Sequence, residues 1–446
     1  MIVQDKTPMT IAAGVKALAG RVRDEGTEER MAFYDAYEGR GMDKAAGVYF
    51  SDAQKRSVPP TTERIVKKLI DARFCVYKTQ PTRVADGRYL DELMGDIDED
   101  MTYLERMTGL QGTMAMLRFW DAGKKILDSR VLPVFEPLFL PGEVEPFGVA
   151  YPLHDPGQQD AAKREWAVWT TVDYFIVSGG RVLPGIDAEG NERTDTAHGL
   201  DRLPVLFAHN GPAIAQRWFR PGAVDMVNAQ LRYNVLGWQH GLGVLWQSLG
   251  QPWTNSGPSR GTPPMLGVDR LLELETGATF RFETADAKLT EILDSQRRLI
   301  DNCAYFNHLQ VKWAGGGATS GEHLRMMEVD LTEAVLADFN RWRPFEDARF
   351  ELDRVLLESV GITIAEDYSV DFTEPHIPDS PAEKREQWTW ELQQGLTNKK
   401  RVLQEMNPDM SDEEIDERLA DVEASQPAPV ESGPSAFAAA LARPVQ

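Results

Sequence analysis

An uncharged stretch inside an otherwise charged chain sets the first limit on the fold. Residues 233–259 contain no Asp, Glu, Lys or Arg, although 26% of the 446 residues are charged. The stretch is not a membrane span, because glycines and polar residues such as Asn234, Gln239 and Gln247 are spread along it. A spanning helix needs about 20 mostly apolar residues. A polar helix without charges is typical of a segment that packs against another protein surface, and we expect that environment here.

The remaining composition is that of an acidic globular protein. The 48 Lys and Arg and the 70 Asp and Glu give a formal net charge of −22, and 42% of residues are hydrophobic. At about 100–200 residues per domain, we expect two or three core-forming units. The negative net charge argues against a protein that binds nucleic acid tightly through its phosphates, since such proteins need clustered Lys and Arg.

Cysteine usage and the first residues favour a cytoplasmic protein. Cys75 and Cys303 are the only cysteines, and they lie far apart in the sequence. Neither has a partner at metal-ligand spacing, so we expect no disulfide framework and no zinc site. The histidines show no metalloprotease pair, and no metal or cofactor is expected. The segment MIVQDKTPMT lacks the basic and apolar regions of a signal peptide.

The first 110 residues or so are predicted to be mainly helical. One helix is expected over residues 60–72, with Thr61 or Thr62 as its cap. Acidic residues at 91–100 lead into a second helix. Its apolar side chains are Leu104, Met107, Leu110, Met114 and Leu117. Carboxylates suit the start of a helix, so we interpret the acidic cluster as a solvated helix start rather than a metal site.

Sheet structure is predicted from about residue 130 to 210, where β-branched and aromatic runs alternate with turn signals. The clearest strand is residues 167–178, followed by a turn at Gly179 and Gly180 and a returning segment. Residues 203–207 are expected to form another short strand.

The chain after residue 221 is predicted to be helical again, with one break. The expected elements are helices at 224–250 and 287–311, β-like pieces at 271–274 and 279–282, and a helix from about 320 to 360. The glycine loop AGGGATSG precedes the long helix, and Pro344 should kink it, because proline removes a backbone donor.

Three short helices are predicted at the carboxyl end, after a strand near 362–364 and a Pro-bounded link. We expect them at 382–394, 398–406 and 412–424. Gly395 would end the first, Thr397 would cap the second, and a capping box from Ser411 to Glu414 would open the third. Residues from 425 onward are rich in Pro, Ala and Ser and are predicted to be a mobile tail.

Two short motifs suggest enzymes, and both lack the required context. Gly316 and Gly321 have the spacing of a phosphate-binding loop, but Glu322 stands where a Lys must reach the phosphates. Ser259 lies in a G-x-S-x-G pattern, but the polar, Pro-broken segment before it is not the buried strand that a nucleophile elbow needs. We therefore expect no catalytic residue. A hydrolase or nucleotide-binding enzyme using Ser259 or the 315–321 loop remains the alternative.

Several segments, taken in order, resemble the portal proteins of tailed bacteriophages, in the broad group that includes the Bacillus phage portals. RIVKKLIDARFCVYKTQP is similar to an early helix and strand, and HGLDRLPVLFAHN to the segment before the first stem helix. VDMVNAQLRYN resembles that stem helix, and ATSGEHLRMMEVDLTEAVLADF the entry to the kinked tunnel helix. WELQQGLTNKKRVLQEMNPDMSDEEIDERLADVEA is similar to the carboxy-terminal helices. The collinear order over residues 30–425 carries the resemblance.

The resemblance implies an α+β, predominantly helical portal fold with wing, stem, clip and crown, and a ring of about twelve subunits. Its parts would be the wing (1–220 and 337–378), two stem helices (221–250 and 287–311), the clip (251–286), the tunnel loop (312–319), the kinked long helix with the wing return (320–378), the crown (379–424) and a disordered tail (425–446).

Two groups of residues acquire roles from the resemblance. The tunnel loop that faces DNA would be Lys312, Trp313, Ala314, Gly315, Gly316, Gly317, Ala318 and Thr319. Lys312 is the one cation of that loop and the candidate phosphate contact, and a surface lysine without a role is the alternative. Subunit packing in and beside the stem would use Trp238, Trp246 and Trp253, because aromatic residues are enriched in interface cores.

The implied function is a DNA conduit rather than a catalyst. The ring would sit at one capsid vertex of a virion, after assembly in the host cytoplasm. It would nucleate head assembly, dock the terminase for genome packaging and dock the adaptor and tail for ejection. Its partners would be other copies of the chain, double-stranded DNA without sequence specificity, the terminase large subunit, a major capsid or scaffolding protein and a head-completion adaptor protein, with no membrane. An electronegative ring suits this role, because it repels the phosphate backbone without holding it. A phage, a prophage, a gene transfer agent and an acidic scaffold that passes no DNA remain open.

Overall fold

The fold was established from a computed structural model. The structure describes residues 1–20, 25–59, 62–154, 165–183, 185–186, 192–193, 195–212, 218–249, 251–254, 279–283, 288–311, 321–374, 381–406 and 410–425. The chain divides into two compact units, Met1–Gly317 with Met326–Pro375, and Ala318–Arg325 with His376–Gln446.

Helices predominate over strands, as the sequence predicted. The chain is mixed α and β, about 52% helical with 18% strand. The helices are α1 (Pro8–Gly20), α2 (Glu25–Tyr37), α3 (Met42–Tyr49), α4 (Asp52–Ser57), α5 (Ile65–Arg73), α6 (Asp98–Gln111), α7 (Val224–Leu249), α8 (Leu289–Phe306), α9 (Gly321–Ser359), α10 (Pro381–Gln394), α11 (Lys399–Met406) and α12 (Asp412–Ser425), with short turns η1 (Val76–Lys78) and η2 (Tyr89–Leu93).

The strands form small antiparallel sheets. They are β1 (Thr82–Val84), β2 (Thr113–Asp121), β3 (Ile126–Leu132), β4 (Glu136–Leu138), β5 (Gly148–Pro152), β6 (Glu165–Thr170), β7 (Tyr174–Ser178), β8 (Arg181–Leu183), β9 (Gly185–Ile186), β10 (Glu192–Arg193), β11 (Val205–His209), β12 (Gln251–Thr254), β13 (Phe280–Glu283) and β14 (Ser369–Asp371). The larger sheets have the strand orders β11-β2-β3 and β4-β5-β6-β7-β8.

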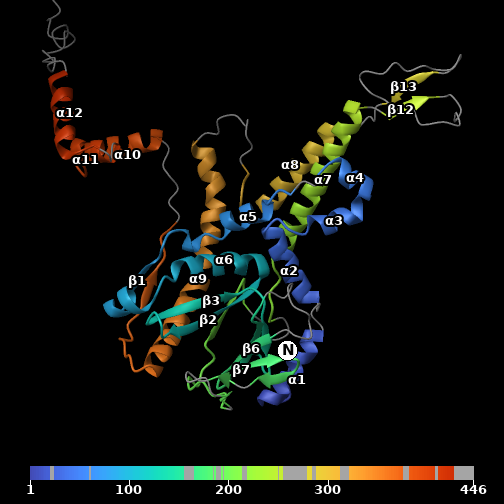
Figure 1. Cartoon of the computed structure of the whole chain (residues 1–446). Coiled ribbons are helices and arrows are strands. Elements are labelled where there is room, and N and C mark those ends of the chain that lie inside the picture. Colours follow the sequence, from blue (N-terminus) through green and yellow to red (C-terminus); the bar gives the residue numbers. More distant parts are fainter. Residues whose placement is uncertain are drawn as a thin grey trace, which may run out of the picture. The chain divides into compact units, whose positions relative to one another are not determined.

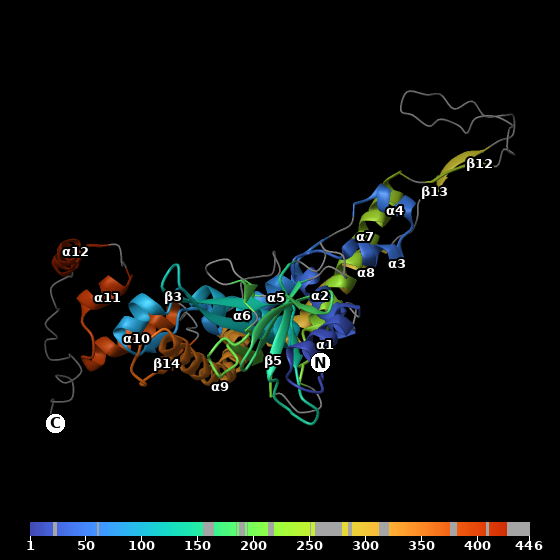
Figure 2. The ribbon, with the colours of Figure 1, turned by 60° about the horizontal axis from the view of Figure 1, so that its bottom comes forward.

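The first unit is built around these two sheets. The helix α6 lies along the three-stranded sheet, and α1 packs against β7 and β8 of the five-stranded sheet (Figures 1 and 2). The main core lies where α2, α5, α6, α7 and α9 meet, and it includes the fully buried Val66, Leu104 and Met107. Burial of such apolar side chains is the main force that holds these helices on the sheet.

The prediction of one long strand over residues 167–178 is wrong, because two strands cover this range. β6 ends at Thr170 and β7 begins at Tyr174, and the two pair as a hairpin. Thr170 makes the turn, since its hydroxyl accepts hydrogen bonds from the backbone N–H of Val172 and of Asp173, at 3.2 and 2.8 Å. A Thr side chain that bonds the backbone two and three residues ahead is a recognised turn former.

The helix predicted to carry Met114 and Leu117 ends earlier in the structure than expected. α6 ends at Gln111, and both residues lie on β2, where they are buried in two different core clusters. Gly112 makes the change of direction, with φ at +81° and its N–H donating to the carbonyl of Thr108. Glycine adopts this left-handed conformation without steric cost, so a helix commonly ends there.

Replacement of Gly112 by Ala is expected to destabilise the fold by about 2–3 kcal/mol, because left-handed backbone strain adds to overpacking. An added Cβ would lie 2.1 Å from the carbonyl oxygen of Arg220, which is a backbone atom and cannot swing away. Urea unfolding of the variant would measure the loss. Gly361→Ala is the matched control, since Gly361 also has positive φ (+78°) but nothing within 4 Å of the added atom. Equal losses in both variants would contradict the steric part of the argument.

Three smaller predictions are also wrong. α5 begins at Ile65 with Arg64 as its N-cap residue and no side-chain cap, so Thr62 does not cap it, and Thr61 lies outside the described residues. Residues 362–364 are not a strand; β14 lies further along and pairs with β1. Asn398 rather than Thr397 caps α11, and its Oδ1 accepts from the N–H of Arg401 at 2.8 Å.

The second unit contains the three predicted carboxy-terminal helices. α10 ends before Gly395, whose φ is +71°, and this confirms the predicted stop. The capping box at α12 is confirmed, because Glu414 accepts from the backbone N–H of Ser411 while the Ser411 hydroxyl accepts from the N–H of Glu414. The predicted mobile tail from residue 425 lies almost entirely outside the described residues.

Candidate functional site

The most distinctive element of the first unit is an antiparallel pair of helices. α7 and α8 pack side by side, and the strands β12 and β13 pair with each other beyond the far end of the pair (Figure 1). Two hydrogen bonds fix the register of the helices: Asn307 Nδ2 donates to Asp225 Oδ2 at 2.8 Å, and Gln296 Nε2 donates to the carbonyl of Tyr233 at 2.9 Å. α7 and α8 correspond to the helices predicted at 224–250 and 287–311. α8 starts two residues later and ends five residues earlier than predicted.

Buried amide side chains hold α7 against the rest of the first unit. Gln230 is 2% exposed and bridges two segments, since its Oε1 accepts from the N–H of Val66 at 2.8 Å and its Nε2 donates to the carbonyl of Ala36 at 2.6 Å. Asn234 is fully buried and bonds both the N–H and the carbonyl of Glu63. An amide can satisfy a donor and an acceptor together, whereas a buried charge there would be left uncompensated.

Trp238 continues this contact one turn further along α7. Its side chain is 1% exposed, its ring lies 4.2 Å from that of Phe50, and its indole N–H donates to the carbonyl of Val58 at 2.9 Å. These contacts are made within the chain, so little of the Trp238 side chain is left for another subunit. The subunit-packing role of Trp238, Trp246 and Trp253 stays a prediction, and the side chains of the last two lie outside the described residues.

The other sequence-predicted site residues fall outside the part of the chain that the structure describes. This holds for the whole tunnel loop, Lys312, Trp313, Ala314, Gly315, Gly316, Gly317, Ala318 and Thr319. It also holds for Ser259, for the β-like piece at 271–274 and for most of the clip. The structure therefore describes α7 and α8, the helices predicted to be the stem, but neither the loop nor the serine and glycine motifs.

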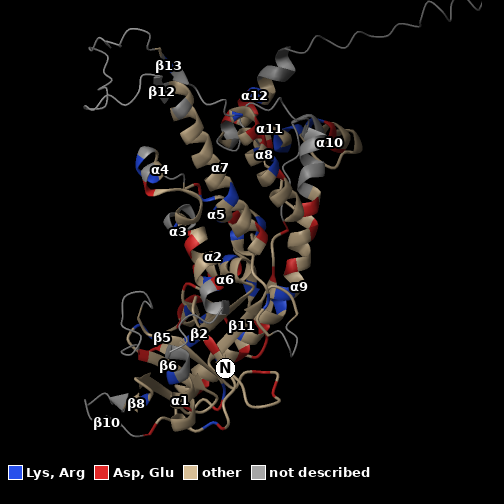
Figure 3. Ribbon diagram, turned by 90° about the vertical axis from the view of Figure 1, so that its right-hand side faces the viewer, with Lys and Arg blue, Asp and Glu red and all other residues tan. Residues whose placement is uncertain are grey.

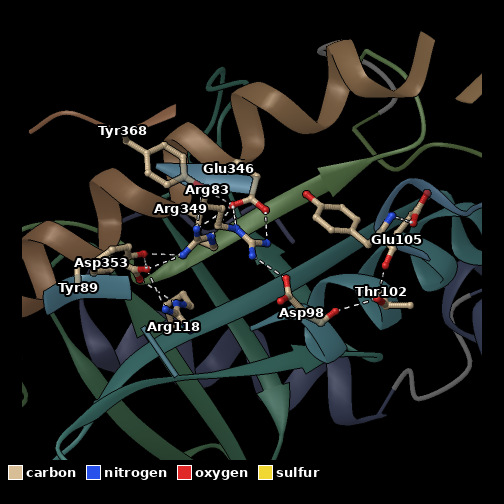
Figure 4. A network of polar contacts seen from close by, with 11 residues as sticks. Arg83, Tyr89, Asp98, Thr102, Glu105, Arg118, Glu346, Arg349, Asp353 and Tyr368 are labelled. Carbon is tan, nitrogen blue, oxygen red and sulfur yellow. Dashed lines mark hydrogen bonds and ion pairs between the residues drawn. The ribbon is translucent and has the colours of Figure 1, made fainter. Parts of the chain in front are cut away.

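Six charged side chains form a buried network where the second half of α9 meets the rest of the first unit (Figure 4). They are Arg83, Arg118, Arg349, Asp98, Glu346 and Asp353. Three are cations and three are carboxylates, so their formal charges cancel. The side chains of Arg349, Glu346 and Asp353 are 0% exposed.

Asp353 is the most heavily bonded member of this network. Its carboxylate accepts from Nε and Nη2 of Arg118, both at 2.8 Å, which is the paired geometry that makes arginine–carboxylate contacts strong. It also accepts from Nη1 of Arg349 at 2.8 Å and from the hydroxyl of Tyr89 at 2.7 Å. Four donors therefore depend on one carboxylate.

Glu346 is held in its charged form by its neighbours. It accepts from Arg83 Nη2, from Arg349 Nε and from the Tyr368 hydroxyl at 2.8–2.9 Å. Burial by itself would raise the pKa of this carboxyl group, but the charges of Arg349 and Arg83 outweigh burial and lower the pKa to about 2. The network joins β1, β2, η2 and α6 to α9, and it fixes the rotation of α9 about its axis.

Sequence analysis predicted none of these network residues. A signal was present, because Glu346, Arg349 and Asp353 recur at three- and four-residue spacing on the same helix as the buried Trp342 and Phe345. Charged residues on an apolar stripe indicate buried, paired charges.

A second buried carboxylate is Glu105 on α6, and its pKa is raised, whereas that of Glu346 is lowered. Glu105 is 1% exposed and accepts from the backbone N–H of Val76 at 2.9 Å and of Tyr77 at 3.1 Å. Burial raises the pKa of Glu105 from 4.5 to about 7, and the two backbone donors only partly oppose this.

Glu105 is therefore expected to make folding stability depend on pH between about 4.5 and 7. The folded state binds a proton that the unfolded chain has lost in this range, so the stabilising contribution is complete below pH 4.5 and disappears as the pH rises through 7. Linkage gives a change on the order of 2–3 kcal/mol.

The test compares the wild type with Glu105→Gln by urea unfolding at pH 4.5 and 7.5. Other titrating groups are common to both proteins and cancel in the difference. The stability advantage of the wild type over the variant should shrink as the pH rises. A difference that is the same at both values would show that the pKa of Glu105 is not raised.

A cavity of about 640 Å³ lies between β11 and α9, lined by Phe207, His209, Asp338, Arg341, Trp342 and Phe345 among others. Its two charged residues are already engaged, since Arg341 donates to Asn210 and pairs with Asp338 at 2.7 Å. Burial and the charge of Arg220 lower the pKa of His209 to about 4, so the imidazole is neutral at pH 7. The described lining of the cavity is thus largely apolar.

No group of three or more His, Cys, Asp or Glu side chains among the described residues could hold a metal ion. No helix in the described ranges is long and apolar enough to cross a bilayer.

No protein-family model matches this chain, and no curated protein is significantly similar to it.

Proposed function

We propose that this chain is the subunit of a portal ring, the DNA conduit at one vertex of a tailed-phage-type capsid. The proposal takes the described elements as its parts: α7 and α8 as the stem, β12 and β13 as the edge of the clip, the sheets with α1–α6 and the second half of α9 as the wing, and α10–α12 as the crown.

One observation carries the proposal. An antiparallel helix pair, α7 and α8, is interrupted at its far end by a strand pair and is followed by a long proline-containing helix and a separate set of short helices. This is the order that the resemblance to portals requires. The segments quoted for the resemblance coincide with α5, β11, α7, α9 and α10–α12.

The charge of the chain supports a conduit rather than a DNA-gripping protein. A formal charge of −22 on each copy makes a ring strongly electronegative. Each Lys or Arg bound to a phosphate would hold the DNA in place with a salt-dependent affinity. An acidic channel instead repels the phosphate backbone and keeps the duplex centred. The terminase, the capsid or scaffolding protein and the adaptor are the partners proposed for the outer surfaces.

Native mass measurement and negative-stain imaging of the purified protein test the proposal. Rings of about twelve 50.0 kDa chains with a central hole about 20–30 Å or more across are expected. Monomers or dimers under all conditions would contradict it. Closed rings without an opening wide enough for a duplex would favour the acidic scaffold. Turnover that is lost on replacing Ser259 by Ala or Gly316 by a larger residue would favour the enzyme alternative.

A further inference from the structure

Two pairs of large apolar side chains are unusually exposed in the first unit. Tyr305 and Phe306, in the last turn of α8, are 68% and 75% exposed, and their rings lie 5.8 Å apart. Val48 and Tyr49, in the last turn of α3, are 79% and 63% exposed. Adjacent exposed apolar residues mark contact surfaces more often than isolated ones do.

The two pairs lie on opposite flanks of α7. On one flank, Phe50 follows directly after α3 and turns inward onto Trp238, which leaves Val48 and Tyr49 facing outward. On the other flank, α8 is held by the bonds of Gln296 and Asn307 to α7. Figure 3 shows α3 and α4 on one side of α7 and α8 on the other, and Figure 1 agrees.

Two of the three charged residues on α4, the helix that follows the first pair, are basic. Lys55 and Arg56 lie on α4, and the Lys55 ammonium is close to α3, only 3.5 Å from the position that a Cβ on Gly47 would take. Lys55 also pairs with the exposed Asp52 at 3.3 Å, while Arg56 is exposed. We call Val48, Tyr49, Lys55 and Arg56 the α3 patch.

The residues around the second pair are acidic. Asp225 is exposed at the start of α7 and is tied to the end of α8 through Asn307. Asp301 is exposed one helical turn before Tyr305, and the exposed Arg298 lies one further turn back along α8. We call Tyr305, Phe306, Asp225 and Asp301 the α8 patch.

We infer that the α3 patch of one copy docks on the α8 patch of the next copy. The patches match in apolar character and are opposite in the charge of their rims, which favours correct docking and disfavours contact between two like patches. Because the two patches differ and lie on opposite flanks, the contact is head-to-tail, and repetition of it generates a ring when the rotation closes. The inference rests on the proposed ring and names the surfaces that build it.

Two double variants test the inference, one in each patch: Val48→Ser with Tyr49→Ser, and Tyr305→Ser with Phe306→Ser. Each should weaken self-association by about tenfold or more, because exposed aromatic anchors dominate interface energies. The replaced side chains are exposed, so thermal unfolding of the monomer should be unchanged. Met9→Ser is the control, since Met9 is 82% exposed on α1 and lies in neither patch.

A mixture of the two double variants separates head-to-tail docking from other modes. Each variant keeps one intact patch, so one copy of each can pair, and growth must stop at a complex of about 100 kDa, twice the 50.0 kDa of one chain. Native mass spectrometry would detect this complex. Self-paired dimers of either variant alone would overturn the head-to-tail arrangement.

Charge reversal gives an independent readout. Lys55→Glu with Arg56→Glu should weaken assembly most at low salt, and Asp225→Lys with Asp301→Lys in the same chain should restore it. Rings that persist unchanged in every patch variant would overturn this inference and leave the portal proposal standing. A wild-type protein that never forms rings would overturn the portal proposal itself.

Discussion

Replacement of Asp353 by Asn is expected to lower the free energy of unfolding by about 3–5 kcal/mol, the cost of leaving buried charges without their partner. The change keeps the side-chain shape but removes the charge that compensates Arg118 and Arg349. Both arginines bond Asp353 at 2.8 Å, and their side chains are 1% and 0% exposed. The amide of Asn would also direct an N–H group at Nε or Nη2 of Arg118, both of which donate to the Asp353 carboxylate.

The effect should be specific to burial rather than to the loss of any ion pair. Glu366 bonds Arg354 at the same 2.8 Å, but it is 81% exposed. Glu366→Gln is therefore the matched control, and it should change stability by less than about 0.5 kcal/mol, because water screens exposed pairs. Urea unfolding of both variants at pH 7 measures the contrast. Similar small losses in both would show that the network around Asp353 is relaxed or hydrated in solution.

Much of the helical framework was predictable, because it depends on local signals. The capping box at Ser411 and the stop at Gly395 act within four residues of the helix end they define. α7, α8 and α9 are long, and their buried residues recur at helical spacing, so length and period agree. Signals of this kind do not depend on distant parts of the chain.

The errors arose where a distant segment or a turn decides the structure. Helical spacing of Leu110, Met114 and Leu117 continues past Gly112, but the backbone at Gly112 lies against the carbonyls of Arg220 and Pro221, more than one hundred residues later. The run of strand-forming residues through Thr170 and Tyr174 conceals a turn, because its hydrogen bonds use an ordinary Thr and no Gly or Pro. Period and propensity alone cannot detect either feature.

The candidate site was predictable only in outline. The positions of α7 and α8 followed from sequence, and so did the expectation that the uncharged stretch beginning at residue 233 packs against protein. The nature of that packing did not follow, because Gln230, Asn234 and Trp238 bond backbone groups of residues 36–66, far away in the sequence. The buried network was missed for the same reason, since Arg118 and Asp353 are 235 positions apart.

Replacement of Trp238 by Ala should destabilise the isolated monomer by about 3–5 kcal/mol, the usual cost of removing a large buried aromatic side chain. The residue was predicted to pack between subunits, and the two roles give different results. A residue that acts only between subunits would leave monomer unfolding unchanged and would weaken association alone. With Trp238 at 1% exposure against Phe50 and Val58, we expect the loss in the monomer itself.

Urea unfolding at a protein concentration that sedimentation shows to be monomeric would measure this loss. Trp390→Ala is the control, because Trp390 is 55% exposed on α10 and should contribute about 1 kcal/mol or less. A double-mutant cycle with Phe50→Ala should show coupling of about 1 kcal/mol, since the two rings lie 4.2 Å apart. Additive losses would mean that the Phe50 ring and the Trp238 ring do not stabilise each other. The end of α3 would then not be held against α7 by this pair. The α3 patch would then lack the rigid support that docking onto a neighbouring α8 requires, so this cycle tests the stem and the proposed contact between copies together.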